Sequence, residues 1–240
     1  MTEDGIRAVY FDMGGVLMNV STEYTRESAL EYALTGPEVK HFLGSEFSIA
    51  SFVDFMSRSI EERAVRQPGL QEDAWRIDKQ TLEIFTGRPV PYSALREKFW
   101  RQVEFMVRCF LPVEGVKELL EKIRLKGLEV GLISNVFHPS IIYKELFTEW
   151  DIIGYFNPLL FSSEFKYKKP HPAIFEYAMS WHPEIDPSQS MFVGDTWEID
   201  VVGARGAGLK PVWVNREYAE PVRENVPVIP SVHDVLDLLG

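Results

Sequence analysis

The chain has 240 residues, a formal net charge of −11 and a sequence pI near 5.0. This acidity argues against nucleic-acid binding, which needs a basic surface, and no apolar run reaches the length of a membrane span. One cysteine, Cys109, excludes an intrachain disulfide and fits a cytoplasmic protein, in which we interpret its side chain as part of the packing.

The first predicted strand covers residues 7–11 and ends in an acid followed by glycines. Asp12 stands at the tip of this apolar run, and Gly14 and Gly15 would let the backbone turn sharply or approach a ligand closely. Asp and Gly are also common turn residues. On its own, the pattern therefore fits a functional strand end and an ordinary tight turn equally well.

Residues 21–106 show no clear strand pattern. Apolar residues such as Phe52, Phe55 and Met56 recur at helical spacing, and Gly36-Pro37 is one of several breaks between helices. Large apolar residues at this spacing are normally core. We therefore predict a helical region whose aromatic residues mostly pack against one another.

From residue 107 onward, helical patterns alternate with short apolar runs. This alternation predicts a parallel, doubly wound sheet with helices on its faces. An amphipathic helix precedes the second strand, and Gly127 is a natural stop for it. Further strands are predicted at residues 128–134, 158–162, 190–194 and 211–214, with a closing helix at 231–239.

Polar residues follow several of these predicted elements. The second strand ends in Ser134 and Asn135, Lys169 precedes a proline and a helix, and Asp195 and Asp200 follow the strand at 190–194. Acids at the carboxyl ends of parallel strands are where open α/β sheets keep their chemistry. Carboxylates without neighbouring cysteine or histidine suit Mg²⁺. Taken alone, the acid pair could also cap a helix.

The set of strand-end residues resembles the haloacid dehalogenase (HAD) superfamily. The motifs of that family are a strand-end Asp-x-Asp, a strand-end Ser or Thr, a Lys before Pro, and Gly-Asp-x-x-x-x-Asp, and this chain has counterparts of all four in the same order. The resemblance covers essentially the whole chain. It implies an α/β fold with a doubly wound, Rossmann-like core at residues 1–20 and 107–240 and an inserted α-helical cap at 21–106.

The resemblance further implies a Mg²⁺-dependent phosphatase that acts on a small phosphorylated metabolite as a monomer or homodimer. Asp12 would be the nucleophile that forms an aspartyl-phosphate, with Lys169 and Ser134 completing the catalytic set. The other implied roles are substrate binding by Ser134, Asn135, Lys169, Met13 and Gly14, and metal binding by Asp12, the Gly14 carbonyl, Asp195 and Asp200.

The chain departs from the family at Gly14, where phosphatases usually carry a second Asp as general acid and base. Losing general acid–base catalysis typically costs roughly 10²–10⁴ in rate. Three alternatives follow. The enzyme is slow or restricted to good leaving groups; or another group, with His138 as the candidate by position, supplies the proton; or the protein is nearly silent and binds a phosphorylated ligand or a protein partner.

Two other family activities rank lower. Dehalogenases also lack the second Asp, but they need no metal and lack the acid pair formed here by Asp195 and Asp200. Mutases depend on the second Asp to return the phosphoryl group. Of the remaining polar residues, we expect His138 to be solvated as a loop histidine and His171 to be structural. We expect Trp197 to pack and Glu198 to be solvated.

Overall fold

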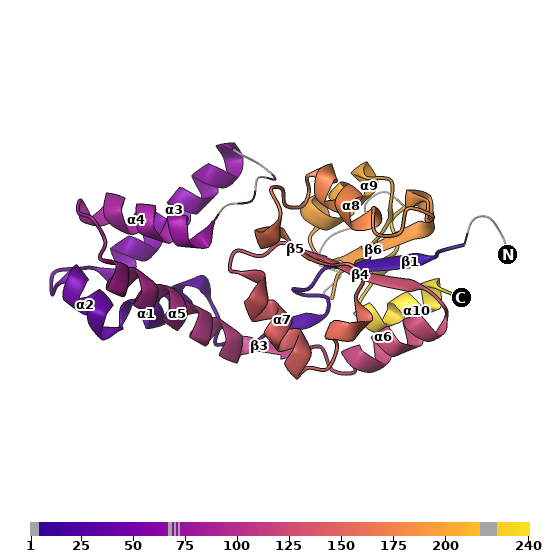
Figure 1. Cartoon of the computed structure of the whole chain (residues 1–240), viewed down its shortest axis with the longest axis horizontal. Coiled ribbons are helices and arrows are strands. Elements are labelled where there is room, and N and C mark those ends of the chain that lie inside the picture. Colours follow the sequence, from indigo (N-terminus) through magenta and orange to yellow (C-terminus); the bar gives the residue numbers. More distant parts are fainter. Residues whose placement is uncertain (1–4, 67–68, 70, 72, 217–224) are drawn as a thin grey trace. The chain divides into compact units, whose positions relative to one another are not determined.

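The computed structural model describes residues 5–66, 69, 71, 73–216 and 225–240 (Figure 1). Two compact units divide the chain: Met1–Asn19, Gly69–Gln71 and Leu111–Gly240 form the first, and Val20–Pro68 and Glu72–Phe110 form the second. The first is an α/β unit and the second is helical. The assignment of a core domain and a cap domain with the boundaries given above stays a prediction.

The described strands of the α/β unit form one parallel sheet in the order β5-β4-β1-β6-β7-β8. In chain order this is 3-2-1-4-5-6, the doubly wound arrangement that the alternating pattern predicted. The sequence did not predict β8, because two residues give no periodic signal. The strands are β1 (Ala8–Phe11), β4 (Glu129–Ser134), β5 (Leu159–Phe161), β6 (Ser190–Gly194), β7 (Lys210–Val214) and β8 (Val228–Ile229).

Helices cover both faces of this sheet. Figure 1 shows α8 and α9 over one face and α6, α7 and α10 over the other. The predicted closing helix is shorter than expected, since a 3₁₀ turn at Val232–Asp234 precedes α10. The bounds are α6 (Val116–Leu125), α7 (Ser140–Glu149), α8 (Pro172–Met179), α9 (Val202–Gly206) and α10 (Val235–Leu238).

Local sequence signals explain where these helices begin and end. Gly127 has a φ of +77° just after α6, as expected for a helix stop. Pro172 is the first residue of α8, and the Nδ1 atom of His171 accepts a hydrogen bond from the Ala173 N–H at 3.2 Å. The expected structural role of His171, as the cap of α8, is confirmed.

The helical unit has its own core. Phe52 is fully buried and packs against Phe47 and Phe85, and Phe55 also contacts Phe85. The predicted packing of these aromatic residues is confirmed, and so is the burial of Cys109. The helices are α1 (Arg26–Leu34), α2 (Pro37–Leu43), α3 (Ile49–Arg66), α4 (Ala74–Thr86) and α5 (Tyr92–Cys109).

Two short strands, β2 (Met18–Val20) and β3 (Phe110–Pro112), pair in a separate two-stranded sheet. Sequence patterns did not reveal them, because three residues are too few to show an alternation. None of the helices in the described part of the chain is long and apolar enough to cross a membrane.

A buried ion pair joins α4 to α5 inside the helical unit. The Nζ atom of Lys98 lies 2.5 Å from Asp78 Oδ1 and donates to Gln102 Oε1 at 2.7 Å. Lys98 and Asp78 are 0% and 2% exposed. Burial lowers the pKa of the Lys98 ammonium, and the facing Asp78 carboxylate opposes that shift.

Candidate active site

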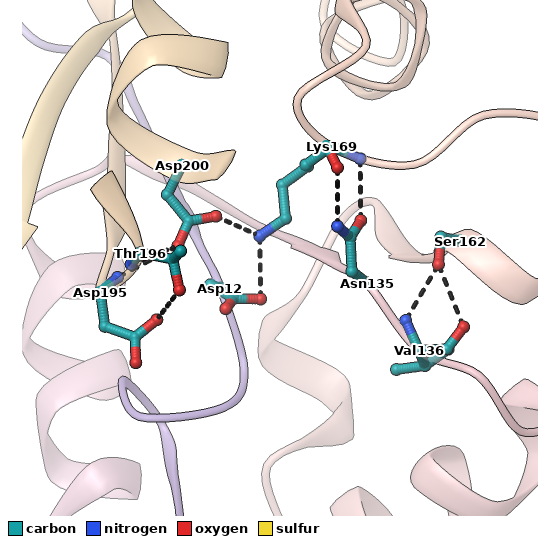
Figure 2. Close-up of polar contacts among 8 residues, drawn as sticks. All are labelled: Asp12, Asn135, Val136, Ser162, Lys169, Asp195, Thr196 and Asp200. Atoms are coloured by element: carbon teal, nitrogen blue, oxygen red, sulfur yellow. Dashed lines mark hydrogen bonds and ion pairs between the residues drawn. The ribbon is translucent and has the colours of Figure 1, made fainter. Parts of the chain in front are cut away.

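The site lies where the strand order reverses, between β1 and β6. These strands are neighbours in register, with Phe11 opposite Val193, and the Asp12 N–H donates to the Val193 carbonyl at 2.9 Å. Asp12 therefore leaves the sheet beside the loop that carries Asp195 and Asp200. Carboxylate oxygens of the three acids all lie within 4.8 Å of one another (Figure 2). The predicted convergence of these acids is confirmed.

Two glycines make this close approach possible. A Cβ atom at Gly15, whose φ is +70°, would lie 2.0 Å from Asp195 Oδ2. A Cβ atom at Gly194 would lie 2.3 Å from the Asp200 Cβ. Any side chain at either position would push an acid out of the cluster.

The loop after β6 holds Asp200 and Asp195 in place. The backbone N–H groups of Asp195 and Thr196 donate to Asp200 Oδ2 at 3.1 and 3.0 Å, and the Thr196 hydroxyl donates to Asp195 Oδ1 at 3.1 Å. The indole Nε1 of Trp213, on the adjacent strand β7, donates to the Asp195 carbonyl at 2.9 Å. A π-helical turn at Trp197–Val201 then brings Asp200 back toward the strand end.

Lys169 lies at the centre of the acidic cluster. Its Nζ atom is 2.9 Å from Asp12 Oδ1 and donates to Asp200 Oδ1 at 2.7 Å (Figure 2). The side chain is 1% exposed, and Nζ lies 4.9 Å from the centroid of the Phe192 ring. Two members of the implied catalytic set, Lys169 and Asp12, are therefore in contact, and their catalytic roles stay a prediction.

The charges of the cluster do not balance. Among the described residues, the cluster has three carboxylates and one ammonium, that of Lys169, which contacts Asp12 and Asp200. Burial raises the pKa of Asp12 to about 6, with Lys169 opposing the shift and the Asp200 and Asp195 charges adding to it. Burial also raises the pKa of Asp195, and the Asp200 charge adds to that shift. Burial alone would lower the pKa of Lys169, but the facing Asp12 and Asp200 carboxylates raise it.

The cluster fits a hard divalent cation. Its ligand atoms are carboxylate oxygens, which Mg²⁺ prefers. Among the described residues, the single charge of Lys169 faces both Asp12 and Asp200, and Asp195 has no ion pair. Within the described residues, the buried Asp12 Oδ1 atom has an ion pair with Lys169 but no further hydrogen-bond partner. Burial, reinforced by the neighbouring carboxylates, raises the pKa of both Asp12 and Asp195, and a bound cation would oppose that shift.

The residues after β4 lie next to this cluster, because β4 pairs with β1. Ser134 ends the strand and is buried. The Asn135 side chain is directed to Lys169, and both of its polar atoms pair with the Lys169 backbone. The implied contact of Asn135 with a substrate phosphate stays a prediction.

The turn after Asp12 is closed by Met13, whose buried backbone carbonyl accepts from the N–H groups of Leu17 and Met18, each at 2.9 Å. A Cβ atom at Gly14 would have no atom within 4 Å, and Gly14 has no positive φ. A larger side chain would therefore fit at position 14. Glycine is not required there by packing or by backbone conformation.

Sequence patterns missed several residues near the site. The side chain of Gln71 donates to the Val136 carbonyl at 3.1 Å, and that of Arg216 donates to the Gly15 carbonyl at 3.0 Å. Ser162, which follows β5, contacts the Val136 backbone. These contacts join residues far apart in the chain, and no local signal could have revealed them.

Three further expectations concern the site rim. His138 was expected to be solvated, and this is wrong: it is 5% exposed and its ring lies edge-on to Phe137, because the loop after β4 folds back into the unit. Trp197 packs against Trp213 with ring centroids 5.0 Å apart, and Glu198 is exposed. Both of these expectations are confirmed.

Comparison with known proteins matches this geometry to one family. A family model described as haloacid dehalogenase-like hydrolase matches residues 6–208. The phosphoglycolate phosphatase of Shigella boydii serotype 4 (strain Sb227) is 26% identical over 254 residues, which cover 99% of this chain and 94% of that protein.

Two further proteins are similar over different extents. The pyrimidine 5'-nucleotidase YjjG of Escherichia coli (strain K12) is 31% identical over 139 residues; the match covers 57% of this chain and 60% of the nucleotidase, less than two thirds of its length. The crystal structure of the HAD-hydrolase YfnB from Bacillus subtilis bound to magnesium has a TM-score of 0.65 at 15% identity, covering 98% of this chain and 99% of that one. This last similarity shows the fold.

Proposed function

This chain belongs to the haloacid dehalogenase-like hydrolases, and from that premise we propose that it is a Mg²⁺-dependent phosphomonoester hydrolase. One observation supports this function above the others: Asp12, Asp195 and Asp200 gather at one sheet edge around the buried ammonium of Lys169. A nucleophilic carboxylate, a fixed cation and an oxygen-ligand set are the parts that phosphoryl transfer through a covalent intermediate needs.

In the proposed reaction, a carboxylate oxygen of Asp12 attacks phosphorus while the bond to the leaving oxygen breaks. The leaving group departs with the electron pair, and water then cleaves the aspartyl-phosphate and frees Asp12. Lys169 holds the Asp12 carboxylate from one side at 2.9 Å and adds positive charge near the transferring group. Ser134, at the end of β4, would donate its hydroxyl to a phosphate oxygen.

Asp12, Asp195, Asp200 and the Gly14 carbonyl would hold the metal. When bound, Mg²⁺ supplies the charge that neutralises the phosphate and the attacking carboxylate. The excess of three carboxylates over the one ammonium of Lys169 among the described residues supports this assignment. Gly15 and Gly194 contribute by letting the acids approach one another.

Gly14 restricts which substrates can react. It carries no group that could protonate the leaving oxygen or activate water, so both steps lack the usual general acid and base. Leaving groups of low pKa need little protonation and should react fastest. The named activities of the two sequence relatives, toward phosphoglycolate and pyrimidine nucleotides, support a small phosphorylated metabolite as the substrate class.

The first experiment measures release of nitrophenol from 4-nitrophenyl phosphate by the native chain, with Mg²⁺ and with a chelator, beside Asp12→Asn. We expect turnover that requires Mg²⁺ and that falls by at least roughly 10³-fold in Asp12→Asn, because the substitution removes the nucleophile. Full activity of Asp12→Asn would contradict the nucleophile assignment. Metal-independent release of halide from a 2-haloacid would identify a dehalogenase instead.

A second experiment uses Gly14→Asp, which has open space for the new side chain. On an alkyl phosphate, the variant should be faster than the native chain by up to roughly 10²–10⁴, the usual worth of general acid–base catalysis. On 4-nitrophenyl phosphate, the gain should be smaller because nitrophenolate leaves without protonation. Equal native rates on the two substrates would show that another group already supplies the proton.

Gly14 also favours a second candidate, a nearly silent protein that binds a phosphorylated ligand or a protein partner. This candidate predicts no turnover of any phosphoester by the native chain at millimolar Mg²⁺, together with tight binding of phosphate. Robust native turnover of 4-nitrophenyl phosphate would remove it.

A further inference from the structure

Asn135 makes a two-point contact with the backbone of Lys169. Its Nδ2 atom donates to the Lys169 carbonyl, and the Lys169 N–H donates to Oδ1, both at 2.8 Å (Figure 2). An amide paired in this way with a peptide group fixes both the position and the orientation of that peptide. Asn135 is therefore placed to set where the Lys169 side chain begins.

Ser162 supports the loop that carries Asn135. The Val136 N–H donates to Ser162 Oγ at 2.9 Å, and Ser162 Oγ donates to the Val136 carbonyl at 3.2 Å (Figure 2). Ser162 is fully buried, at 0% exposure. The register of β4 and β5, with Ser134 opposite Phe161, brings these two loop starts together.

The position of the Lys169 backbone matters because its side chain has little freedom to compensate for a shift. The side chain is 1% exposed, packs over the Phe192 ring and ends between Asp12 and Asp200. A lysine on the surface could follow a moving partner by changing rotamers, whereas a close-packed interior resists such adjustment. A displaced backbone would therefore carry the ammonium away from Asp12.

We propose that Asn135 and Ser162 act together as positioning residues, a clamp that holds Lys169 in contact with the Asp12 carboxylate. The clamp connects the ends of β5 and β4 to the lysine. Neither residue needs to touch the substrate for this role, which differs from the phosphate contact that family resemblance implies for Asn135. Only the effect of the clamp on turnover rests on the proposed phosphatase function.

The direct test is pulse labelling of lysines with acetic anhydride, read residue by residue by mass spectrometry. The full native chain is compared with Asn135→Ala, Ser162→Ala and Ser140→Ala. Ser140 is the matched control, since it is a buried serine whose hydroxyl donates to Glu164 at 2.6 Å, outside the clamp. Lys98, buried in the helical unit, is an internal control for general loosening.

We expect Lys169 to be acetylated several-fold faster in Asn135→Ala and, to a smaller extent, in Ser162→Ala, with Lys98 protected in all variants. The Ser140→Ala variant should match the native chain at Lys169. Unchanged Lys169 labelling in both clamp variants would overturn the proposal. Equal gains at Lys98 and Lys169 would also overturn it, because they would indicate general destabilisation. If Asn135→Ala fails to fold, the labelling of Lys169 in Ser162→Ala alone decides whether the proposal holds.

Turnover of 4-nitrophenyl phosphate gives a second readout. A misplacement of about 1 Å can cost as much as ~10²-fold in rate, so we expect kcat to fall about 10- to 100-fold in Asn135→Ala and less in Ser162→Ala, with KM changed little. The double variant should be no worse than Asn135→Ala, since the two residues act in series. A raised KM at native kcat in Asn135→Ala alone would favour a phosphate contact and contradict the clamp. If the native chain turns over nothing, the phosphatase proposal fails, and the labelling still decides the clamp.

Discussion

Each of the two compact units buries a lysine, and the surroundings of the two lysines differ in charge. In the helical unit, Lys98 faces one carboxylate, Asp78, and one neutral amide, Gln102. In the α/β unit, Lys169 lies among three carboxylates. Both ammonium groups are almost completely excluded from solvent. Burial alone therefore does not separate a structural ion pair from a functional site.

The balance of charge distinguishes the site around Lys98 from the site around Lys169. The Lys98 pair is neutral as a unit, and Lys98 also donates to the neutral Gln102 amide, so its charge is balanced by Asp78 alone. The Lys169 cluster has an excess of negative charge. Burial raises the pKa of both Asp12 and Asp195, and the neighbouring carboxylates add to that shift. This excess of charge supports the proposal that a cation binds there.

The largest effect expected from this comparison is on stability, at Lys98. Lys98→Met leaves the Asp78 carboxylate buried without a counter-charge, and breaking a buried pair in this way typically costs about 3–5 kcal/mol. Chemical denaturation should show this loss in the free energy of unfolding, while kcat under conditions where the protein is folded stays near the native value.

The double variant Lys98→Met with Asp78→Leu is the control for this prediction. Replacing both members of a buried pair by apolar residues is often neutral or stabilising, so most of the lost stability should return. A large drop in kcat of the folded Lys98→Met protein would contradict the purely structural role of this pair.

A substitution at Asp12 is expected to change the free energy of unfolding by a smaller amount and in the opposite direction. In a chelator, Asp12→Asn should stabilise the folded protein above pH 6, on the order of 1–3 kcal/mol, because it removes a carboxylate that burial disfavours. The measurement is urea denaturation of native and variant chains between pH 4 and pH 8.

The pH dependence follows from the raised pKa of Asp12, which is about 6 in the folded state against 3.8 for an ordinary aspartate carboxyl. At a pH below the pKa of Asp12 in the unfolded chain, the carboxyl is protonated in both states and does not lower the free energy of unfolding. As the pH rises through 6, the folded state must carry the disfavoured charge and loses stability. The difference in the free energy of unfolding between Asp12→Asn and the native chain should therefore shrink as the pH falls toward 4. A difference that does not change with pH would contradict the raised pKa of Asp12.

The sequence predicted the parts of the fold and site that leave a local signal. The strands β1 and β6 are apolar runs that end in Asp12 and in the Gly194-Asp195 pair, and such ends are readable without coordinates. Strands of two or three residues, such as β2, β3 and β8, are too short to show an alternation of apolar and polar residues. The open space at Gly14 also needed coordinates, although the missing acid itself was visible.

The parts that could not be predicted are contacts between distant residues. Asn135 and Lys169 are 34 positions apart, and nothing in either motif indicates that the amide pairs with the lysine backbone. Ser162 looks like an ordinary loop serine. The burial of His138 and the pairing of Lys98 with Asp78 likewise depend on how separate elements pack, which helical and strand periods do not encode.

The most direct test of the central claim is calorimetric titration of Mg²⁺ into the native chain, into Asp195→Asn, and into the double variant Lys98→Met with Asp78→Leu. We predict that the native chain binds one ion, that Asp195→Asn binds it much more weakly, and that the double variant binds it like the native chain. Absence of Mg²⁺ binding to the native chain, or binding that is unaffected by Asp195→Asn, would contradict the claim that the unbalanced charge around Lys169 marks a cation site.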